Sequence, residues 1–399
     1  MKHLLVIRTV FVFVAALALS ASTRVARADS EPYRFNIVLS LSGTASFLGK
    51  QEQNSFEIEE KLINKTGGIN GRPVQFVYHD DQSSPQVGLQ LLKKIASEKA
   101  PFVLGSSIRA VCNAMLPLVD KGPLLYCISN SFQPRPGSFG FSGNVSSRDT
   151  TAALMRFFQQ KRWKRLALIT STDATGQEAD VDITAAVNEL ASEGLSIVER
   201  AHFSMTDVSV SAQIERMKAS QPDAVIAWST GTPIATVFKG LVQGGLNVPV
   251  ATTNANQTLT QMSSYEDFLP KELYMPCPAW LDQPDGAGET NPQVAAAHRA
   301  FIDAFKEAGI VPDGGSILGW DLPLILVDTL SKLSTDATAA QLRDYISHLK
   351  DFGGLNGVYN FEKTPQRGLD ISSAIITRWN SSKKYWDVVS RPGGKPIQP

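Results

Sequence analysis

Residues 35–49, FNIVLSLSGTASFLG, carry the pattern on which the predicted fold depends. Four of the first five residues are apolar, as in a buried strand, and residues 42–46 are small enough for a loop. From residue 50 to residue 63 apolar residues recur at roughly helical spacing. The stretch therefore predicts a strand, a loop of small residues and a helix. Such a loop can present backbone N–H groups and the Phe47 ring to a small solute.

Strand-like and helix-like segments alternate along the rest of the chain, which predicts parallel sheets with helices on both faces. Strands are predicted at 35–39, 74–79, 102–104, 124–127, 166–170, 196–202, 224–228 and 248–252, and near the C-terminus at 372–379 and 384–389. Helices are predicted at 85–98, 150–161, 179–193, 208–220, 233–244, 293–308, 318–333 and 339–349.

The chain length and this repeated cadence indicate two lobes. The sequence has 399 residues, and chains longer than about 250–300 residues usually divide into domains. The same cadence runs through residues 35–145 and again through 165–275. We predict an α/β fold of two doubly wound lobes with parallel-type sheets. Lobe 1 is expected to hold residues 29–145 and 277–354, and lobe 2 residues 146–276 and 355–399.

The first 28 residues have the form of a secretory signal peptide. Lys2 and Arg8 precede an apolar run at 10–19, and Ala26-Arg27-Ala28 resembles a cleavage site. A membrane anchor is the alternative, but the run is too short to cross about 30 Å of hydrocarbon. A lipid anchor is not expected, since the first cysteine is Cys112. We predict cleavage after Ala28 and a mature protein in the periplasm.

The charge and the cysteine content bear on the partners of the protein and on its disulfides. The chain has 38 basic and 38 acidic residues, and removing the signal peptide leaves a small acidic excess. A nucleic-acid partner is not expected, because it would require a basic face. The three cysteines, Cys112, Cys127 and Cys277, leave at least one unpaired in an oxidising compartment. A bridge between Cys112 and Cys127 stays open at this point.

Signatures of catalysis are missing from the sequence. No G-x-G-x-x-G follows a predicted strand, and neither H-E-x-x-H nor G-x-S-x-G occurs. Residues 43–50 depart from a phosphate-binding loop, because the spacing of the glycines differs and Gln51 follows Lys50. The histidines are scattered. We therefore expect no enzyme activity, no catalytic residues, no metal site and no cofactor.

Small polar clusters directly follow six predicted strands. They lie at residues 42–43, 105–107, 129–131, 171–176, 229–232 and 252–256. Any one of them is also explained as a helix cap, since Ser and Thr are common there. Open α/β sheets, however, bind ligands at the carboxyl ends of parallel strands. Six clusters, three in each predicted lobe, predict a cleft for a small polar or anionic solute.

The order of these segments resembles that of the type I periplasmic solute-binding proteins of ABC transporters. The similar branch includes the leucine/isoleucine/valine-binding proteins, and the resemblance covers nearly all of the mature chain. The segments that carry it are the loop at 42–49, NKTGGING at 64–71, the turn at 80–85, Gly105-Ser106-Ser107, and GGLNG at 353–357 followed by Phe361. The resemblance implies two lobes joined by three hinge crossings that close on a ligand, with the third crossing near 354–357. It also implies a monomer that delivers a small molecule to an inner-membrane ABC permease.

Departures from the family pattern bear on the ligand. Amino-acid binders of this family carry an acid that pairs with the ligand ammonium, and the matching residues 252–256 hold only Thr, Asn and Ala. A buried ammonium without a carboxylate partner is costly, so an amino acid would need Asp173 as a substitute. We therefore predict a small organic carboxylate, with an aromatic acid favoured. An amino-acid binder and a ligand-sensing subunit of a membrane receptor stay as alternatives.

The predicted ligand-binding residues come from all six clusters. N–H groups of the loop after the third strand, with Arg109, are expected to receive the ligand carboxylate, and Phe47 and Trp228 to flank its body. Core packing for Trp228 and a solvated position for Arg109 are the alternatives. The full set is Ser42, Phe47, Ser106, Ser107, Ile108, Arg109, Ser129, Ser131, Asp173, Thr175, Trp228, Thr230, Thr253 and Asn254.

Overall fold

The predicted first strand is an inner strand of a parallel sheet. The computed structural model describes residues 31–278 and 291–397. β1 (Tyr33–Leu39) pairs in parallel with one strand on each side, and Phe35, Ile37 and Leu39 are fully buried. Burial on both faces is expected of a parallel strand that helices cover. The following helix, α2 (Ser46–Lys65), begins four residues before Lys50, so that Phe47 lies in its first turn and not in a loop.

The first sheet has five strands in the order β2-β1-β3-β4-β5, all parallel. Its other strands are β2 (Val74–Asp80), β3 (Phe102–Gly105), β4 (Leu124–Cys127) and β5 (Gly140–Ser142). β5 was not among the predicted strands, because its Gly and Ser residues are poor strand formers. It is held by pairing with β4.

The second sheet has seven strands in the order β14-β13-β10-β9-β8-β6-β7. Its strands are β6 (Arg165–Ser171), β7 (Ser196–Phe203), β8 (Ala224–Trp228), β9 (Val250–Ala251), β10 (Leu273–Pro278), β13 (Ala374–Asn380) and β14 (Tyr385–Val388). β6 to β10 run parallel, whereas β13 and β14 add an antiparallel edge. β10 was not predicted, because prolines at 276 and 278 argue against a strand inside a sheet.

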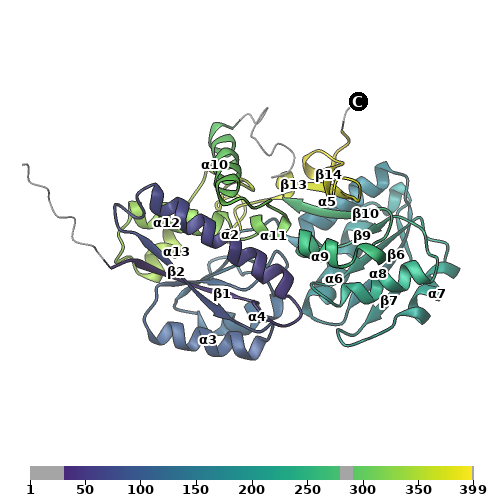
Figure 1. Ribbon diagram of the computed structural model, residues 1–399, viewed down its shortest axis with the longest axis horizontal. Coiled ribbons are helices and arrows are strands. Elements are labelled where there is room, and N and C mark those ends of the chain that lie inside the picture. Colours follow the sequence, from purple (N-terminus) through teal and green to yellow (C-terminus); the bar gives the residue numbers. More distant parts are fainter. Residues whose placement is uncertain (1–30, 279–290, 398–399) are drawn as a thin grey trace, which may run out of the picture. The chain divides into compact units, whose positions relative to one another are not determined.

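Helices cover both sheets. Those of the first half are α2, α3 (Pro85–Ser97) and α4 (Arg109–Met115) around the first sheet, and α5 (Ser147–Gln160), α6 (Ala174–Glu189), α7 (Ser211–Ala219), α8 (Ile234–Gln243) and α9 (Leu259–Ser264) around the second. The chain then forms α10 (Pro292–Ala308), α11 (Gly314–Ile317), α12 (Asp321–Lys332) and α13 (Ala339–Ser347). α10 and α11 contact α2, and α13 contacts β4, so these helices return to the first sheet (Figure 1).

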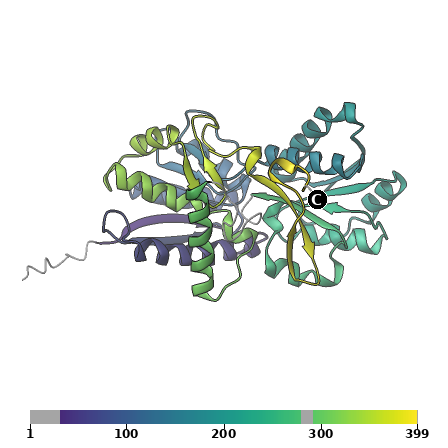
Figure 2. The same cartoon turned by 90° about the horizontal axis from the view of Figure 1, so that it is seen from above.

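The chain thus passes between two α/β lobes, each named here by its sheet as the first or the second lobe. The last strands, β13 and β14, lie with the second lobe, where Figure 2 shows them in yellow beside the green and teal elements. The first crossing is residues 143–146, between β5 and α5. The second predicted boundary, between residues 276 and 277, falls inside β10 of the second sheet, so the chain leaves this lobe after Pro278. The predicted signal peptide at 1–28 lies outside the described residues.

The third crossing can be located from hydrogen bonds. A hairpin of β11 (Phe352–Gly354) and β12 (Gly357–Tyr359) precedes it. Asp321 of α12 accepts hydrogen bonds from the backbone N–H groups of Leu355 (2.7 Å) and Asn356 (2.9 Å), and the Tyr359 hydroxyl lies 2.9 Å from the same carboxylate. Since these contacts hold the hairpin to the first lobe, we propose that the chain crosses after Tyr359 and not at residue 355.

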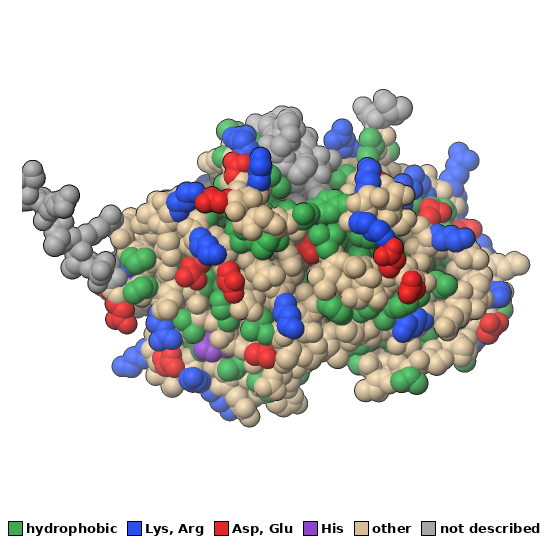
Figure 3. All heavy atoms as spheres, viewed as in Figure 1, with side chains coloured by type: hydrophobic (Ala, Val, Ile, Leu, Met, Phe, Trp, Pro, Cys, Tyr) green, Lys and Arg blue, Asp and Glu red, His purple; other side chains and the backbone are tan. Residues whose placement is uncertain are grey.

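The surface carries charges of both signs. On the face seen in Figure 3, Lys and Arg side chains are interspersed with Asp and Glu side chains over both lobes. This face has no block of one sign of the kind that nucleic-acid binding requires. Within residues 31–278 and 291–397, no helix combines the length and the apolar character needed to cross a membrane.

Candidate functional site

The predicted site residues lie where the sequence analysis expected them along the chain, directly after the strands. β1, β3 and β4 of the first lobe end at Leu39, Gly105 and Cys127, and small polar residues follow each of them. β6, β8 and β9 of the second lobe end at Ser171, Trp228 and Ala251, again followed by such residues. Parallel strands end at the same edge of a sheet, so each lobe has one rim made of three loops.

Three pairs of loops join the two rims. The loop after β1 meets the loop after β8, where the Thr232 N–H donates to the Thr44 carbonyl at 3.0 Å. The loop after β4 meets the segment after β9, where Asn130 Nδ2 donates to Asn254 Oδ1 at 3.1 Å. The two rims therefore face one another and are in contact in this structure.

The third pair joins the loop after β3 to α6. Arg109 forms an ion pair with Glu178 (2.5 Å), and its Nη1 lies 3.4 Å from the carbonyl oxygen of Ala174. Both charged side chains are mostly buried, at 17% and 19% exposure. Arg109 was predicted to pair with a ligand carboxylate, but its charge is already balanced here by Glu178. The arrangement is that of a contact between lobes.

A glycine permits the approach of the first pair. Gly231, with φ +83°, lies so close to the loop after β1 that a Cβ would come within 2.2 Å of the Thr44 carbonyl oxygen. A larger residue at this position would force the two loops apart, and a positive φ is also unfavourable for it.

The loop after β3 is held from several directions. Ser106 is fully buried, and its Oγ accepts a hydrogen bond from the Ile108 N–H at 3.1 Å. The Ser106 carbonyl accepts a bond from the Ser129 N–H of the neighbouring loop at 3.3 Å. A disulfide between Cys112 and Cys127, with Cα atoms 6.3 Å apart, links α4 to the end of β4 behind both loops. The bridge that the sequence left open is thus present, and Cys277 is free and buried.

Glu52 of α2, which was not among the predicted site residues, contacts this loop. Its Oε1 and the Ser107 hydroxyl are hydrogen-bonded. Its side chain is only 1% exposed, and its Oε2 has no hydrogen-bond partner among the described residues. Burial, with a smaller contribution from the Asp81 carboxylate, raises the pKa of Glu52 to about 8 although the Ser107 hydrogen bond opposes the shift. The sequence signal was its helical spacing from the buried residues Leu48 and Phe56.

A second missed residue, Arg367, lies behind the loop after β4. Ser129 and Ser131 are buried there, with their hydroxyl oxygens 3.1 Å apart. Arg367 donates to the Phe132 carbonyl at 2.5 Å, the Asn144 carbonyl at 2.7 Å and Ser142 Oγ at 3.0 Å. Burial lowers the pKa of Arg367 to about 10, so it stays a cation at neutral pH. Nothing in the sequence around Arg367 distinguishes it from the other arginines.

In the second lobe, most predicted residues are buried and two act as caps. Asp173 caps α6, since its Oδ1 accepts from the Gly176 N–H at 3.2 Å and from the Ser171 hydroxyl at 2.5 Å. Thr253 accepts from the Ala255 N–H at 3.3 Å. Trp228 belongs to the hydrophobic core at 1% exposure, which fits the alternative given for it. Thr175, Thr230 and Asn254 are buried at the same rim.

The residues after β1 differ in exposure. Ser42 is exposed, and its hydroxyl donates to Asp80 Oδ2 at 2.7 Å. Phe47 is half-buried and meets Tyr265 of the second lobe edge to face, with ring centroids 6.2 Å apart. Phe47 is therefore part of the contact between lobes, and Ser42 is held by its own lobe.

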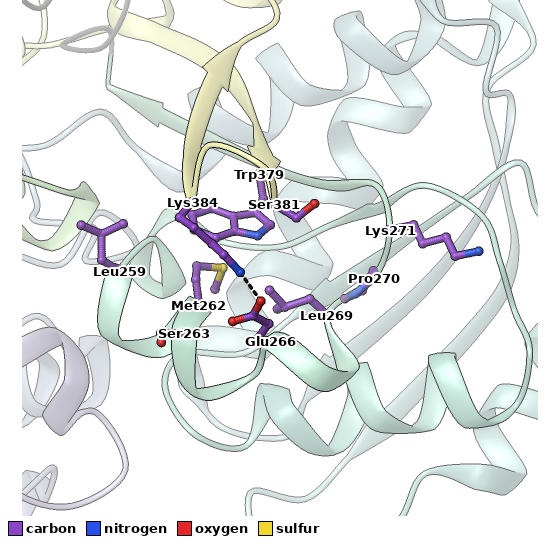
Figure 4. A pocket seen from close by; sticks show the side chains of 10 residues that line it. All are labelled: Leu259, Met262, Ser263, Glu266, Leu269, Pro270, Lys271, Trp379, Ser381 and Lys384. Carbon is purple, nitrogen blue, oxygen red and sulfur yellow. Dashed lines mark hydrogen bonds and ion pairs between the residues drawn. The ribbon is translucent and has the colours of Figure 1, made fainter.

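A separate cavity of about 560 Å³ opens within the second lobe. Figure 4 shows Met262 and Trp379 on its walls and an ion pair between Lys384 and Glu266 beside them. Its walls come from residues 259–271 and from the β13–β14 hairpin. None of the predicted site residues lines this cavity, so it is distinct from the facing rims.

Comparison with known proteins gives a consistent family and fold. A family model described as periplasmic binding protein matches residues 32–384. A Brucella abortus protein named Leu/Ile/Val-binding protein homolog 1 is 25% identical over 389 residues, covering 93% of this chain and 96% of its own.

Two solved structures share the fold. A solute-binding protein of a Rhodopseudomonas palustris ABC transporter, in complex with benzoate, has a TM-score of 0.75 at 16% identity, with 92% of this chain and 98% of that one covered. A branched-chain amino acid transporter substrate-binding protein from Streptococcus pneumoniae, in complex with isoleucine, has a TM-score of 0.72 at 16% identity, with 90% and 99% covered.

Proposed function

Since the chain belongs to the periplasmic binding protein family, whose members bind solutes and are not enzymes, we propose that it captures a small organic carboxylate between its two rims. We further propose that an inner-membrane ABC permease receives the solute from the closed form. The protein has no chemistry of its own in this role, since hinge closure alone captures and releases the solute.

The observation that carries the proposal is the pairing of loops across the rims. The hydrogen bonds from Asn130 to Asn254 and from Thr232 to Thr44 join loops that belong to different sheets. A lobe that rotates away about the crossings would break these contacts and open the cleft. Closure would then remake them around a solute, which supports capture between the lobes.

An anionic solute is favoured by the charges near the rims. Residues 252–256 include no acid that would pair with a ligand ammonium, and the Asp173 carboxylate is already used by two donors at the start of α6. Among the described residues, Arg367 has hydrogen bonds only to neutral acceptors, and the Asp149 and Asp182 carboxylates interact with it without a hydrogen bond. A buried cation of this kind attracts an anion to the adjacent Ser129–Ser131 loop. The benzoate bound to the Rhodopseudomonas palustris protein makes an aromatic acid a suitable first probe.

Three further assignments belong to this proposal. We propose that residues 1–28 direct export and are removed, and that the mature protein acts as a monomer. We also propose that twelve of the fourteen predicted residues line the site, since Trp228 lies in the core and Arg109 in the contact between lobes. Glu52 lies behind them and contacts Ser107. The lobe division is kept as predicted except at two crossings: we place the second after β10, which ends at Pro278, and the third after Tyr359.

The test is ligand binding measured by calorimetry and by thermal shift. We expect benzoate or another carboxylate without an amino group to bind the purified protein more tightly than isoleucine. Mass spectrometry of the small molecule released on denaturation should find a compound of the same class. Binding of isoleucine and not of any carboxylate lacking an amino group would contradict the ligand class.

A single substitution tests the missing acid. Asn254→Asp keeps the acceptor for Asn130 and adds a charge at the second rim. We expect it to weaken benzoate binding by about tenfold through charge repulsion and to improve isoleucine binding.

Uptake of labelled ligand by cells that lack the gene separates a transport role from a receptor-linked sensor, because only a transport protein is needed for uptake.

A further inference from the structure

The contact between Glu52 and Ser107 links a buried acid to the proposed ligand loop. Glu52 lies on the inward face of α2, and its neighbours on that face, Ser55 and Phe56, are buried as well. Its Oε1 is hydrogen-bonded to the Ser107 hydroxyl, and its Oε2 is buried without a hydrogen-bond partner in residues 31–278 and 291–397. A buried carboxylate with one hydrogen bond is costly, whereas a neutral carboxyl group is much less so.

The two protonation states of Glu52 give the Ser107 hydroxyl opposite roles. A hydroxyl has one hydrogen to donate and two lone pairs that accept. If Glu52 is neutral, its O–H donates to Ser107 Oγ, and the Ser107 hydrogen is free for a ligand. If Glu52 is ionised, the Ser107 hydrogen turns to Glu52, and a ligand meets an oxygen lone pair beside a negative charge.

We propose that Glu52 is the residue that makes the loop after β3 selective for anions, because its neutral carboxyl group keeps the Ser107 hydroxyl as a donor. The inference rests on the proposed function, since it assigns the ligand carboxylate to this loop. Glu52 acts through Ser107 and is a positioning residue. When Glu52 is ionised, the same loop disfavours an anion, because Ser107 then presents an oxygen lone pair beside a negative charge.

The charged groups around Glu52 favour the neutral form. Asp81, directly after β2, is buried and adds a like charge. Arg109, two residues after Ser107, is paired with Glu178 and is not free to stabilise a second carboxylate. On α2 itself, Lys50 is exposed, and Glu59, two turns on, is buried and also acidic. The raised pKa of about 8 agrees with this geometry.

The experiment measures benzoate affinity from pH 6 to pH 9.5 in the wild type and in Glu52→Gln. Benzoate itself stays ionised over this range, so a change in affinity reports on the protein. We expect the wild-type dissociation constant to rise by up to tenfold per pH unit above about pH 8. Glutamine donates to Ser107 as neutral Glu52 does but cannot ionise. E52Q should therefore bind benzoate with little pH dependence.

A second readout needs no ligand. The folded protein keeps the Glu52 proton up to about pH 8, whereas the unfolded chain loses it near the ordinary value of 4.5. Between pH 4.5 and about pH 8, the free energy of unfolding of the wild type falls as the pH rises, and E52Q does not show this decrease. The melting temperature of E52Q should exceed that of the wild type at pH 8, and the difference should shrink towards pH 5.

The control is Glu57→Gln, on the exposed face of the same helix. E57Q should follow the wild type in both readouts. A pH dependence of benzoate binding that persists in E52Q, or a melting difference that does not change with pH, overturns the role of Glu52 alone. If no carboxylate binds the wild-type protein at pH 6 to 7, the proposed function itself is overturned, and the selection for anions with it.

Discussion

At the scale of the residue, Arg367 shows how a buried cation can be held by hydrogen bonds to neutral acceptors, with the Asp149 and Asp182 carboxylates near enough to favour its charged form. Its guanidinium donates to three carbonyl groups and a hydroxyl, from Asn130, Phe132, Asn144 and Ser142. Asn144 lies in the first crossing, and Arg367 follows β12 in the segment that makes the third. The planar fork of arginine fits several acceptors at once, which a lysine ammonium cannot do at the same positions. Arg367 therefore ties two crossings together.

We expect Arg367→Lys to lower the free energy of unfolding by about 3 kcal/mol, because at least one buried carbonyl loses its donor and the cation is held less well. Urea-induced unfolding followed by circular dichroism measures the change. Arg216→Lys is the matched control, since Arg216 is 56% exposed and pairs with Glu199 at the surface. It should cost less than about 1 kcal/mol. Equal losses in both variants would contradict the structural role of Arg367.

Residue chemistry in the site was only partly predictable from the sequence. The small polar residues were found because strand ends are visible in the hydrophobic pattern. Glu52 and Arg367 were missed because their burial depends on contacts between segments far apart in the chain. Arg109 was found, but its partner Glu178 lies on another lobe, and no local pattern indicates such a pair.

At the scale of the element, the two loops of the first rim are organised around the disulfide. Cys112 lies in α4 and Cys127 ends β4, at a sequence separation of 15. Both sulfurs are buried against Phe132, directly behind Ser106 and Ser129. The bridge therefore restrains the elements that carry both loops.

Removing this bridge should destabilise the protein by about 3 kcal/mol, the value expected for a loop of this length. Cys112→Ser with Cys127→Ser tests it, with the unfolding midpoint in urea measured in the presence and absence of dithiothreitol. The reductant should shift the wild type and Cys277→Ala alike, and leave the double variant unchanged. A double variant that still responds to the reductant would refute the assignment of the bridge.

Elements themselves were predicted well where the pattern was local. Strands such as 124–127 and 224–228 match the structure at both ends, because continuous apolar runs between turn residues mark buried parallel strands. Predictions were wrong where a capping side chain or pairing with distant strands determines whether an element forms and where it begins. α6 begins at Ala174 because Asp173 caps it, and β10 forms despite two prolines because neighbours on both sides hold it.

At the scale of the whole molecule, the contacts between rims set the balance between open and closed forms. The Arg109–Glu178 pair is a direct ionic link between lobes, next to the loop that carries Ser107. In the hinge closure that we propose, closing makes this pair and opening breaks it. A solute that binds only the closed form has its affinity reduced by any change that favours the open one.

We expect Arg109→Gln and Glu178→Gln each to weaken benzoate binding about fivefold, which corresponds to about 1 kcal/mol for a partly exposed pair. The double variant should be no weaker than either single one, since all three lose the same contact. Small-angle X-ray scattering without ligand should show a larger radius of gyration in the variants. Arg148→Gln, which breaks an exposed pair with Glu189 inside the second lobe, should change neither the benzoate affinity nor the radius of gyration.

If Arg109 instead touched the ligand, R109Q would abolish binding and E178Q would strengthen it by freeing the guanidinium. Opposite signs in the two single variants thus contradict the link between lobes and restore the direct contact that the sequence suggested.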